Sequence, residues 1–174
     1  MLNQLNLQQN SLSDLREWAK LMPIGLARYA SRGRWKMARH LSLLNRLLLN
    51  VAAGHIKRLI VSIPPRHGKS ELISKYFPVW FIGNFPDKSV ILSSYDSSYA
   101  ASWGMKSMDV MKQVGGELWG LKIRSDAQAH DNWLIRGYTG GMMTAGVGGP
   151  ITGKGADLLI IDDPNKNADS IRTL

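Results

Sequence analysis

The sequence predicts an α/β fold with a mainly parallel sheet flanked by helices. Short runs of β-branched and apolar residues, at positions 59–63, 90–94 and 157–161, alternate with longer stretches in which apolar residues recur at helical spacing. A chain of 174 residues with 44% hydrophobic and 20% charged content is long enough for one domain with a substantial core. Because it contains no cysteine, disulfides and cysteine-based zinc sites are excluded.

The N-terminal residues precede the expected main domain. Residues 1–12 are rich in Asn, Gln and Leu, and we expect them to form a loose arm. Asp14 and Glu17 resemble a capping pair that opens a short helix, which Pro23 should end. The sequence therefore predicts an N-terminal arm and helix over residues 1–33.

The middle of the chain is predicted to form a helix, a strand, a loop and a second helix. Apolar residues recur at helical spacing over residues 34–53, and Gly54 follows as a C-cap. The β-branched run 59–63 is typical of a buried parallel strand. A loop over 64–68 then leads into a helix expected over 69–82.

The second half continues the alternation. Residues 90–94 are predicted to form a strand, and residues 97–114 a helix that the pair Gly115–Gly116 should end. Residues 121–147 contain short apolar runs between Gly and Asp turns, which favours small antiparallel strands or hairpins. The apolar run 157–161 is predicted to be a strand that ends in two carboxylates.

The net charge of +9 is distributed unevenly. Residues 1–75 hold 13 Lys or Arg against three acids, whereas residues 76–174 hold nine against ten. A basic N-terminal part attracts polyanions such as nucleic acid, although solvated faces of amphipathic helices would give the same excess. The most apolar long segment, residues 34–53, carries four basic side chains, so we expect no membrane span.

The stretch Pro-Pro-Arg-His-Gly-Lys-Ser at residues 64–70 nearly matches a phosphate-binding loop. Gly68, Lys69 and Ser70 fit the pattern G-x-x-x-x-G-K-[ST], but Ile63 occupies the first glycine position. Such a loop needs backbone N–H groups at a helix N-terminus, a lysine for the phosphates and a hydroxyl for Mg²⁺. The alternative is a Pro-Pro turn followed by a basic helix start.

A second stretch supplies the acids that such a loop requires. The apolar run 158–161 ends in Asp162 and Asp163. Asp162 is predicted to hold Mg²⁺ and Asp163 to polarise the attacking water, the roles that carboxylates have in ATP hydrolysis. The alternative reading is a strand-ending turn, since Asp and Pro favour turns.

Several stretches together resemble the large terminase subunits of tailed bacteriophages, the ATPases that drive genome packaging. The matching stretches lie in family order at positions 57–61, 64–71, 93–96, 100–101, 148–157 and 162–164. The resemblance implies a P-loop NTPase domain of the ASCE type over residues 34–174, with a deviant Walker A loop whose arginine corresponds to Arg66. It also implies ATP and Mg²⁺ as ligands and an Mg-dependent ATPase activity.

The resemblance assigns roles to individual residues. The ATP-binding set comprises Pro65, Arg66, His67, Gly68, Lys69, Ser70 and Glu71, with His40 expected to contact the base. Ser70 and Asp162 would bind the metal, and Asp163, Arg66 and Lys69 would act in catalysis. Some relatives place an arginine before the acidic strand that reaches a neighbouring subunit's site. Here Lys154 is the nearest equivalent, with Arg136 and Arg124 as rivals.

The resemblance also implies what surrounds the chain. Family partners are double-stranded DNA, the terminase small subunit and the portal, in a homo-oligomeric motor in the cytoplasm of the bacterial host. We expect the ATPase domain to be truncated after the Walker B strand, without a nuclease domain, and to lack the strand that normally separates the loop strand from the acidic strand. Two alternatives remain: a non-hydrolysing remnant that binds nucleotide, DNA or a partner, and another DNA-dependent translocase.

Overall fold

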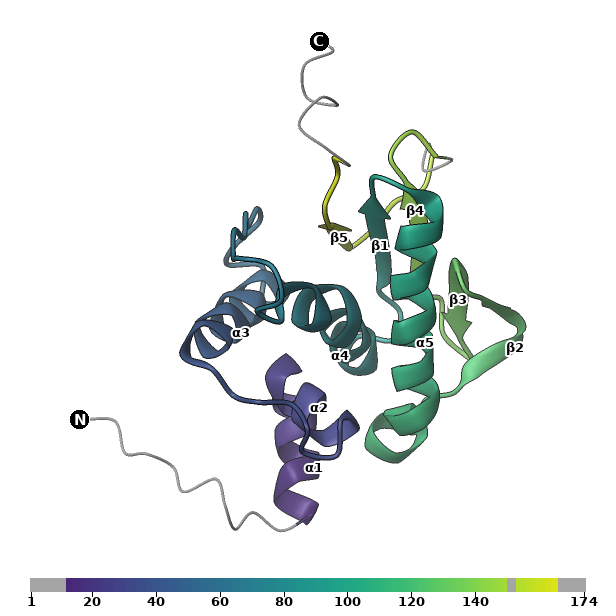
Figure 1. The fold of residues 1–174 in the computed structure, drawn as a ribbon. Helices are drawn as coiled ribbons and strands as arrows, with labels where there is room; N and C mark the ends of the chain where they lie inside the picture. The colour runs from purple at the N-terminus through teal and green to yellow at the C-terminus, as the bar shows by residue number, and fades with distance from the viewer. Residues whose placement is uncertain (1–11, 150–152, 166–174) are drawn as a thin grey trace.

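A five-stranded mixed sheet organises the chain, in the order β2-β3-β4-β1-β5 (Figure 1). The computed structural model describes residues 12–149 and 153–165. The helical elements are α1 (Leu12–Leu21), α2 (Pro23–Ala30), α3 (Arg39–Ala52), the π-helical turn η1 (Glu71–Tyr76), α4 (Phe77–Asn84) and α5 (Ser97–Trp119). The strands are β1 (Ser89–Ser94), β2 (Ile123–Ala129), β3 (Asn132–Ile135), β4 (Gly141–Gly146) and β5 (Leu158–Ile161).

The α/β class is confirmed, but the sheet is mixed rather than mainly parallel. Strand β1 pairs in parallel with both β4 and β5, whereas β3 pairs antiparallel with β2 and with β4. The hairpin region expected over 121–147 is thus confirmed, and its last strand joins the central sheet. The long helix α5 packs along β4 and β1 (Figure 1).

The strand predicted over residues 59–63 is wrong for this structure. Leu59, Val61 and Ile63 pack against the core, but the segment joins none of the described strands, and Ile60 is 96% exposed. A strand exists only where a neighbour receives its backbone hydrogen bonds, and none lies beside this segment in the described part of the chain. Strand β5 likewise has no neighbour on its outer edge among the described strands, and its Leu159 is exposed.

Three helix boundaries also differ from the prediction. Pro23 does not end the first helical region but begins α2, where a residue without an N–H is tolerated in the first turn. Helix α3 begins at Arg39, not at residue 34. Helix α5 continues through Gly115–Gly116 and ends at Trp119, and the next residue, Gly120, has a φ of 70°, the left-handed conformation typical of a glycine after a helix.

The predicted loop and the helix after it are confirmed in outline. Helical structure runs from Lys69 to Asn84, but its first part is the π-helical turn η1. Pro78 lies just after this turn, where its missing N–H prevents a regular α-helical bond to the carbonyl of Ser74. Irregular helix geometry therefore begins beside the candidate loop.

Helices and strands contribute buried side chains to one hydrophobic core. Its largest fully buried side chains come from helices and strands alike and include Ile24, Leu72, Phe77, Leu92 and Trp133. The helices α1 and α2 contribute to the same core as the sheet. Residues 1–11 of the predicted arm lie outside the described residues. Within the described residues, no helix has both the length and the apolar composition that a membrane span needs.

Candidate functional site

The segment between residues 63 and 71 forms a loop with two residues in the left-handed conformation. Arg66 has a φ of 63° and Gly68 a φ of 83°. For Gly68 this conformation carries no steric penalty, whereas Arg66 adopts it despite its Cβ. A Cβ on Gly68 would also lie 3.4 Å from the Cδ atoms of Leu41, so α3 lies directly behind the loop.

Lys69 faces both carboxylates at the end of β5. Its Nζ lies 3.2 Å from Asp163 Oδ1 and 3.7 Å from Asp162 Oδ1. The Lys69 side chain is 25% exposed, Asp163 is 54% exposed and Asp162 only 6%. The loop cation and the two acids, predicted from separate stretches of sequence, therefore converge on one position.

Asp162 is held by two hydroxyl groups from one helical stretch. Ser70 Oγ donates to Asp162 Oδ1 at 3.1 Å, and Ser74 Oγ donates to Asp162 Oδ2 at 2.9 Å. The backbone N–H of Asp162 donates to Ser93 O on β1 at 2.9 Å. Each oxygen of this buried carboxylate thus has its own donor. Ser74 was not predicted from the sequence, although its position four residues after Ser70 places both on one helix face.

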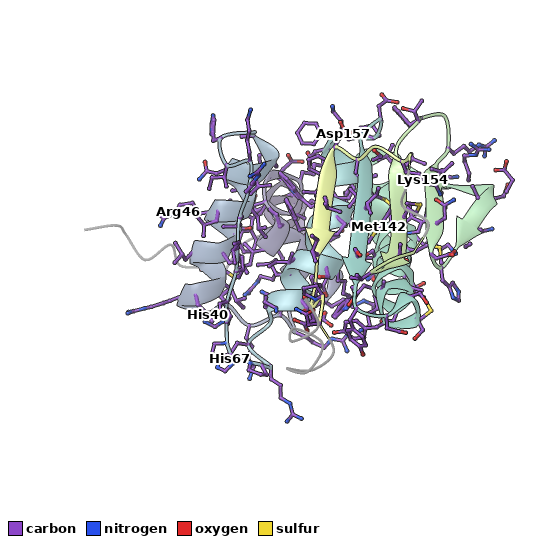
Figure 2. The ribbon with its side chains drawn as sticks, turned by 90° about the horizontal axis from the view of Figure 1, so that it is seen from above. His40, Arg46, His67, Met142, Lys154 and Asp157 are labelled. Atoms are coloured by element: carbon purple, nitrogen blue, oxygen red, sulfur yellow. The ribbon has the colours of Figure 1, made fainter. Side chains whose placement is uncertain are left out.

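Two histidine side chains hydrogen-bond to the backbone of the loop. His40 Nε2, at the start of α3, donates to the carbonyl oxygen of His67 at 2.9 Å, and His67 Nδ1 donates to the carbonyl oxygen of Pro65 at 2.7 Å. The rings of the two histidines meet edge to face, and Figure 2 shows them side by side. The observed contact of His40 is with the loop backbone, and its predicted contact with a base stays a prediction.

A cavity of about 400 Å³ opens over the loop. Besides Ile63 and Pro64, its walls include every predicted ATP-binding residue except His40, together with Tyr99, Trp103 and Asp163. The two aromatic rings lie one helical turn apart on α5 and contact each other edge to face. Sequence reasoning missed them, although their i, i+4 spacing after strand β1 placed both on one face of the predicted helix. Glu71 lines the cavity and pairs with Lys75 at 2.9 Å.

The candidate finger residues lie away from this cavity. Lys154 lines a second, larger cavity of about 870 Å³ at the ends of β1 and β4, and its Nζ lies 3.0 Å from the sulfur of Met143. In Figure 2 Lys154 lies beside the sheet, apart from His40 and His67. Arg124 pairs with Asp126 at 2.7 Å. None of the three predicted finger residues lines the loop cavity of its own chain.

Asp96 is the N-cap of α5. Its Oδ1 accepts from the backbone N–H groups of Ser98 and Tyr99 at 2.9 and 3.0 Å, so it caps the N-terminus of α5. Tyr95 stacks on Tyr99 with ring centroids 5.5 Å apart. The cap fixes the first turn of α5, which carries Tyr99 toward the loop cavity.

The donor atoms suit a hard cation that shares its ligands with a phosphate. Among the described residues no group of three or more His, Cys, Asp or Glu side chains could hold a metal ion. Mg²⁺ usually keeps several waters and takes only one or two carboxylates plus substrate phosphates. The hydroxyl of Ser70 beside Oδ1 of Asp162 fits that donor set.

The fold and the site define an α/β protein in which a basic loop meets a pair of acids at the end of a parallel strand. A family model described as "Terminase large subunit, T4likevirus-type, N-terminal" matches residues 60–174. The chain therefore belongs to the terminase large subunit family, which confirms the predicted resemblance and supports a role in a DNA-packaging motor. Comparisons with curated proteins and with solved structures gave no match.

Proposed function

We propose that this chain is the ATP-binding and ATP-hydrolysing P-loop module of a phage terminase large subunit, which powers the translocation of viral DNA into procapsids. The observation that carries the proposal is the meeting of Lys69 and Ser70 with Asp162 and Asp163, although more than 90 residues separate the two pairs in sequence. Family membership supports a nucleotide-dependent motor.

In the proposed complex the triphosphate lies in the loop cavity. The backbone N–H groups from Arg66 to Ser70 and the Lys69 ammonium would bind its oxygens, with Arg66 as a second cation. The Lys69 ammonium would then leave Asp163 and pair with a phosphate oxygen. Ser70 and Asp162 would hold Mg²⁺, which supplies charge neutralisation of the phosphates when bound.

Asp163 is proposed to act on the attacking water. Its carboxylate is half-exposed, and it becomes free to accept a hydrogen bond from water once Lys69 turns to the phosphates. The water oxygen attacks the γ-phosphorus, the bond from that phosphorus to the bridging oxygen breaks, and the water proton passes through Asp163 to solvent. The products are ADP and inorganic phosphate.

One observation favours a second candidate, a remnant that binds nucleotide without hydrolysing it. The segment 59–63 leads into the loop but shares no hydrogen-bonded strand with β5, which carries the acids. Catalysis requires the two halves of the site to hold a fixed separation, and no described strand links them. Turnover distinguishes the two candidates.

The test is ATP binding and steady-state hydrolysis by the chain, compared with Lys69→Ala and Asp163→Asn. Lys112→Ala, an exposed lysine on α5, is the matched control. We expect hydrolysis that both site variants abolish and the control retains. Binding without turnover would favour the remnant, and absence of binding would contradict the site.

A basic surface supports DNA as the partner. Exposed cations gather on α3 and its flanking segments, and no ion pair among the described residues involves them: Arg32, Lys36, Arg39, Arg46, Lys57 and Arg58. Figure 2 shows Arg46 pointing outward. If this surface binds duplex DNA, affinity should fall steeply with salt, and a flat salt dependence would contradict it.

The family also supports further proposals about the assembled motor. We place it in the host cytoplasm, with the small subunit and the portal as partners and several copies of the chain in one assembly. In such an assembly Lys154 or Arg136 would reach the loop cavity of a neighbouring copy. This is consistent with the absence of both residues from the lining of the loop cavity in their own chain.

A further inference from the structure

Ser74 is a fully buried hydroxyl that contacts a functional acid without lining the candidate cavity. Its exposure is 0%, and its Oγ donates to Asp162 Oδ2 at 2.9 Å. Ser70, one helical turn earlier, donates to the other carboxylate oxygen and does line the cavity. The two carboxylate oxygens therefore have different partners: Oδ1 accepts from a residue that lines the cavity, and Oδ2 accepts from a fully buried one.

The backbone carbonyl of Ser74 accepts a hydrogen bond from a side chain of α5. Proline at position 78 has no N–H with which to bond the carbonyl four residues earlier, which is that of Ser74. The single O–H of Ser107, buried in α5, is shared between the carbonyls of Ser74 and Lys75, at 3.1 and 3.2 Å. The π-helical turn is thereby tied to α5, and Ser74 is held between α5 and β5.

In the metal-bound state the Ser70 hydroxyl would serve two partners. Its oxygen would ligate the cation through a lone pair while its O–H still donates to Asp162 Oδ1, so its position would follow the metal as well as the acid. Ser74 is fully buried and donates to Oδ2, the carboxylate oxygen that Ser70 does not contact. Its bond to Oδ2 would persist while Oδ1, beside the Ser70 hydroxyl, binds the cation.

We infer that Ser74 is a positioning residue that holds Asp162 in the orientation for metal binding, an inference that rests on the proposed function. Partners of metal ligands contribute about 10-fold to 100-fold in metal affinity. The role predicts a specific defect in Ser74→Ala: weaker binding of the metal with unchanged binding of the metal-free nucleotide.

The experiment measures Mn²⁺ binding to the full chain with bound ADP, by electron paramagnetic resonance. In Ser74→Ala we expect the Mn²⁺ affinity to fall about tenfold. The affinity for a fluorescent ADP analogue in EDTA should be unchanged, because the residues that line the loop cavity are untouched. Ser74→Cys keeps the side-chain shape, with a larger atom that donates only weakly, and it should show the same loss of Mn²⁺ affinity; it replaces the alanine variant if that one does not fold.

Ser107→Ala is the matched control. It removes an equally buried hydroxyl from the same polar cluster but leaves both bonds to Asp162 in place. We expect it to lower the melting temperature while Mn²⁺ affinity is kept. Unchanged Mn²⁺ affinity in both Ser74 variants, or an equal loss in Ser107→Ala, overturns the inference. If the unmodified chain binds no ADP at all, the proposed function fails and this inference fails with it.

Discussion

Lys69 Nζ lies 3.2 Å from Asp163 Oδ1, although 94 residues separate them in the sequence. The same ammonium group lies 3.7 Å from Asp162 Oδ1, so one cation is shared by two adjacent carboxylates. The phosphates of a nucleotide would compete with these acids for it. Nucleotide binding and the ion pairs of the two acids are therefore physically coupled.

Lys69→Ala should affect both stability and ligand response. Removal of the shared cation leaves two neighbouring carboxylates without the positive charge of Lys69 between them. We therefore expect the free energy of unfolding to fall by about 1 kcal/mol. Mg-ATP should raise the melting temperature of the unmodified chain and of Lys112→Ala, but not of this variant. Urea unfolding and thermal melts measure the two effects. A normal nucleotide-induced shift in Lys69→Ala would contradict the assigned site.

His40→Ala separates two roles of this histidine. If His40 supports the loop through the carbonyl of His67, the variant should bind ATP and inorganic tripolyphosphate more weakly by the same factor, about fivefold for one lost hydrogen bond. If His40 contacts the adenine, only ATP binding should suffer. Competition against a fluorescent nucleotide measures both affinities, and His55→Ala, beyond the end of α3, is the control.

Two glycines of α5 should respond in opposite directions to the same substitution. A Cβ on Gly104 would lie 2.3 Å from the backbone oxygen of His130, so Gly104→Ala must displace the β2–β3 turn, at a cost of about 1–3 kcal/mol. At Gly116 the nearest atom is 3.9 Å away, so Gly116→Ala should stabilise the helix by about 0.5–1 kcal/mol. The free energies of unfolding of the two variants, measured with denaturant, distinguish these effects. Equal effects would mean that the hairpin does not pack on α5 as described.

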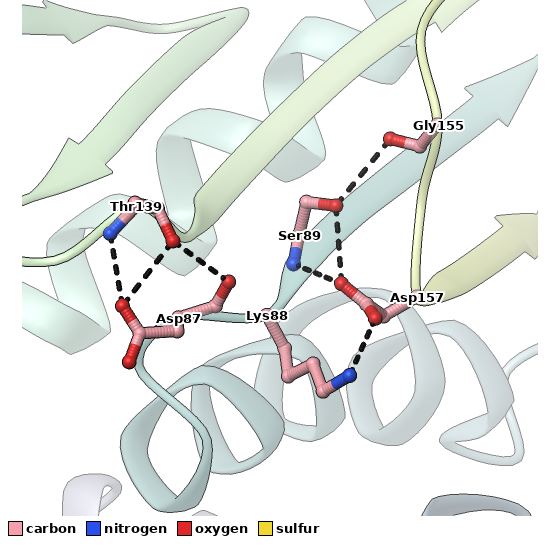
Figure 3. Close-up of polar contacts among 6 residues, drawn as sticks. All are labelled: Asp87, Lys88, Ser89, Thr139, Gly155 and Asp157. Atoms are coloured by element: carbon pink, nitrogen blue, oxygen red, sulfur yellow. Dashed lines mark hydrogen bonds and ion pairs between the residues drawn. The ribbon is translucent and has the colours of Figure 1, made fainter.

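Asp157 gives the chain an acid-sensitive contact at the start of β5 (Figure 3). Its carboxylate accepts from Lys88 Nζ at 2.7 Å and from the backbone N–H of Ser89 at 2.9 Å. The hydrogen bond from Lys88, followed by that from Ser89, lowers the pKa of Asp157 below its ordinary value of 3.8. The contribution to stability is therefore present above pH 3.8 and is lost as the pH falls through the lowered pKa.

Asp157→Asn tests this contact. Because the pair is partly exposed, we expect the free energy of unfolding at neutral pH to fall by only about 0.5 kcal/mol. The difference from the unmodified chain should shrink as the pH drops below 3.8. Lys88→Ala should cause a similar loss, and the double variant should lose less than the sum. Additive effects would show that the two side chains do not interact in solution.

The outer edge of β5, which no described strand pairs, predicts self-association. Leu159 and Ile161, on one face of this strand, are 57% and 58% exposed, and unpaired edges beside apolar side chains favour pairing between chains. Leu159→Lys should shift the chain toward the monomer in sedimentation velocity. Leu43→Lys, at a residue that is 49% exposed on α3, should have little effect. If both variants behave alike, association does not use the strand edge.

Local sequence patterns predicted most helices and strands, because the periodicity of apolar side chains within a segment indicates which of the two it forms. The alternation that gave β1, α5 and β5 follows from side-chain periodicity, and these elements formed where expected. The continuation of α5 through Gly115–Gly116 was missed because local propensity favours a stop there. Packing favours continuation: a Cβ on Gly115 would lie only 3.3 Å from the backbone oxygen of Leu121, so a residue without a side chain lets the chain after α5 pack closely on this helix.

By itself the sequence determined which groups the site contains: a Gly-Lys-Ser loop between an apolar run and a helix, and two aspartates after another apolar run. The tertiary structure alone decided how these groups meet. Ser74 became a partner of Asp162, and His40 a support of the loop, because α3, the loop helix and β5 converge in space. The apolar run before the loop, in contrast, did not become a sheet strand. Propensity belongs to a segment, whereas a strand requires a second segment to receive its hydrogen bonds.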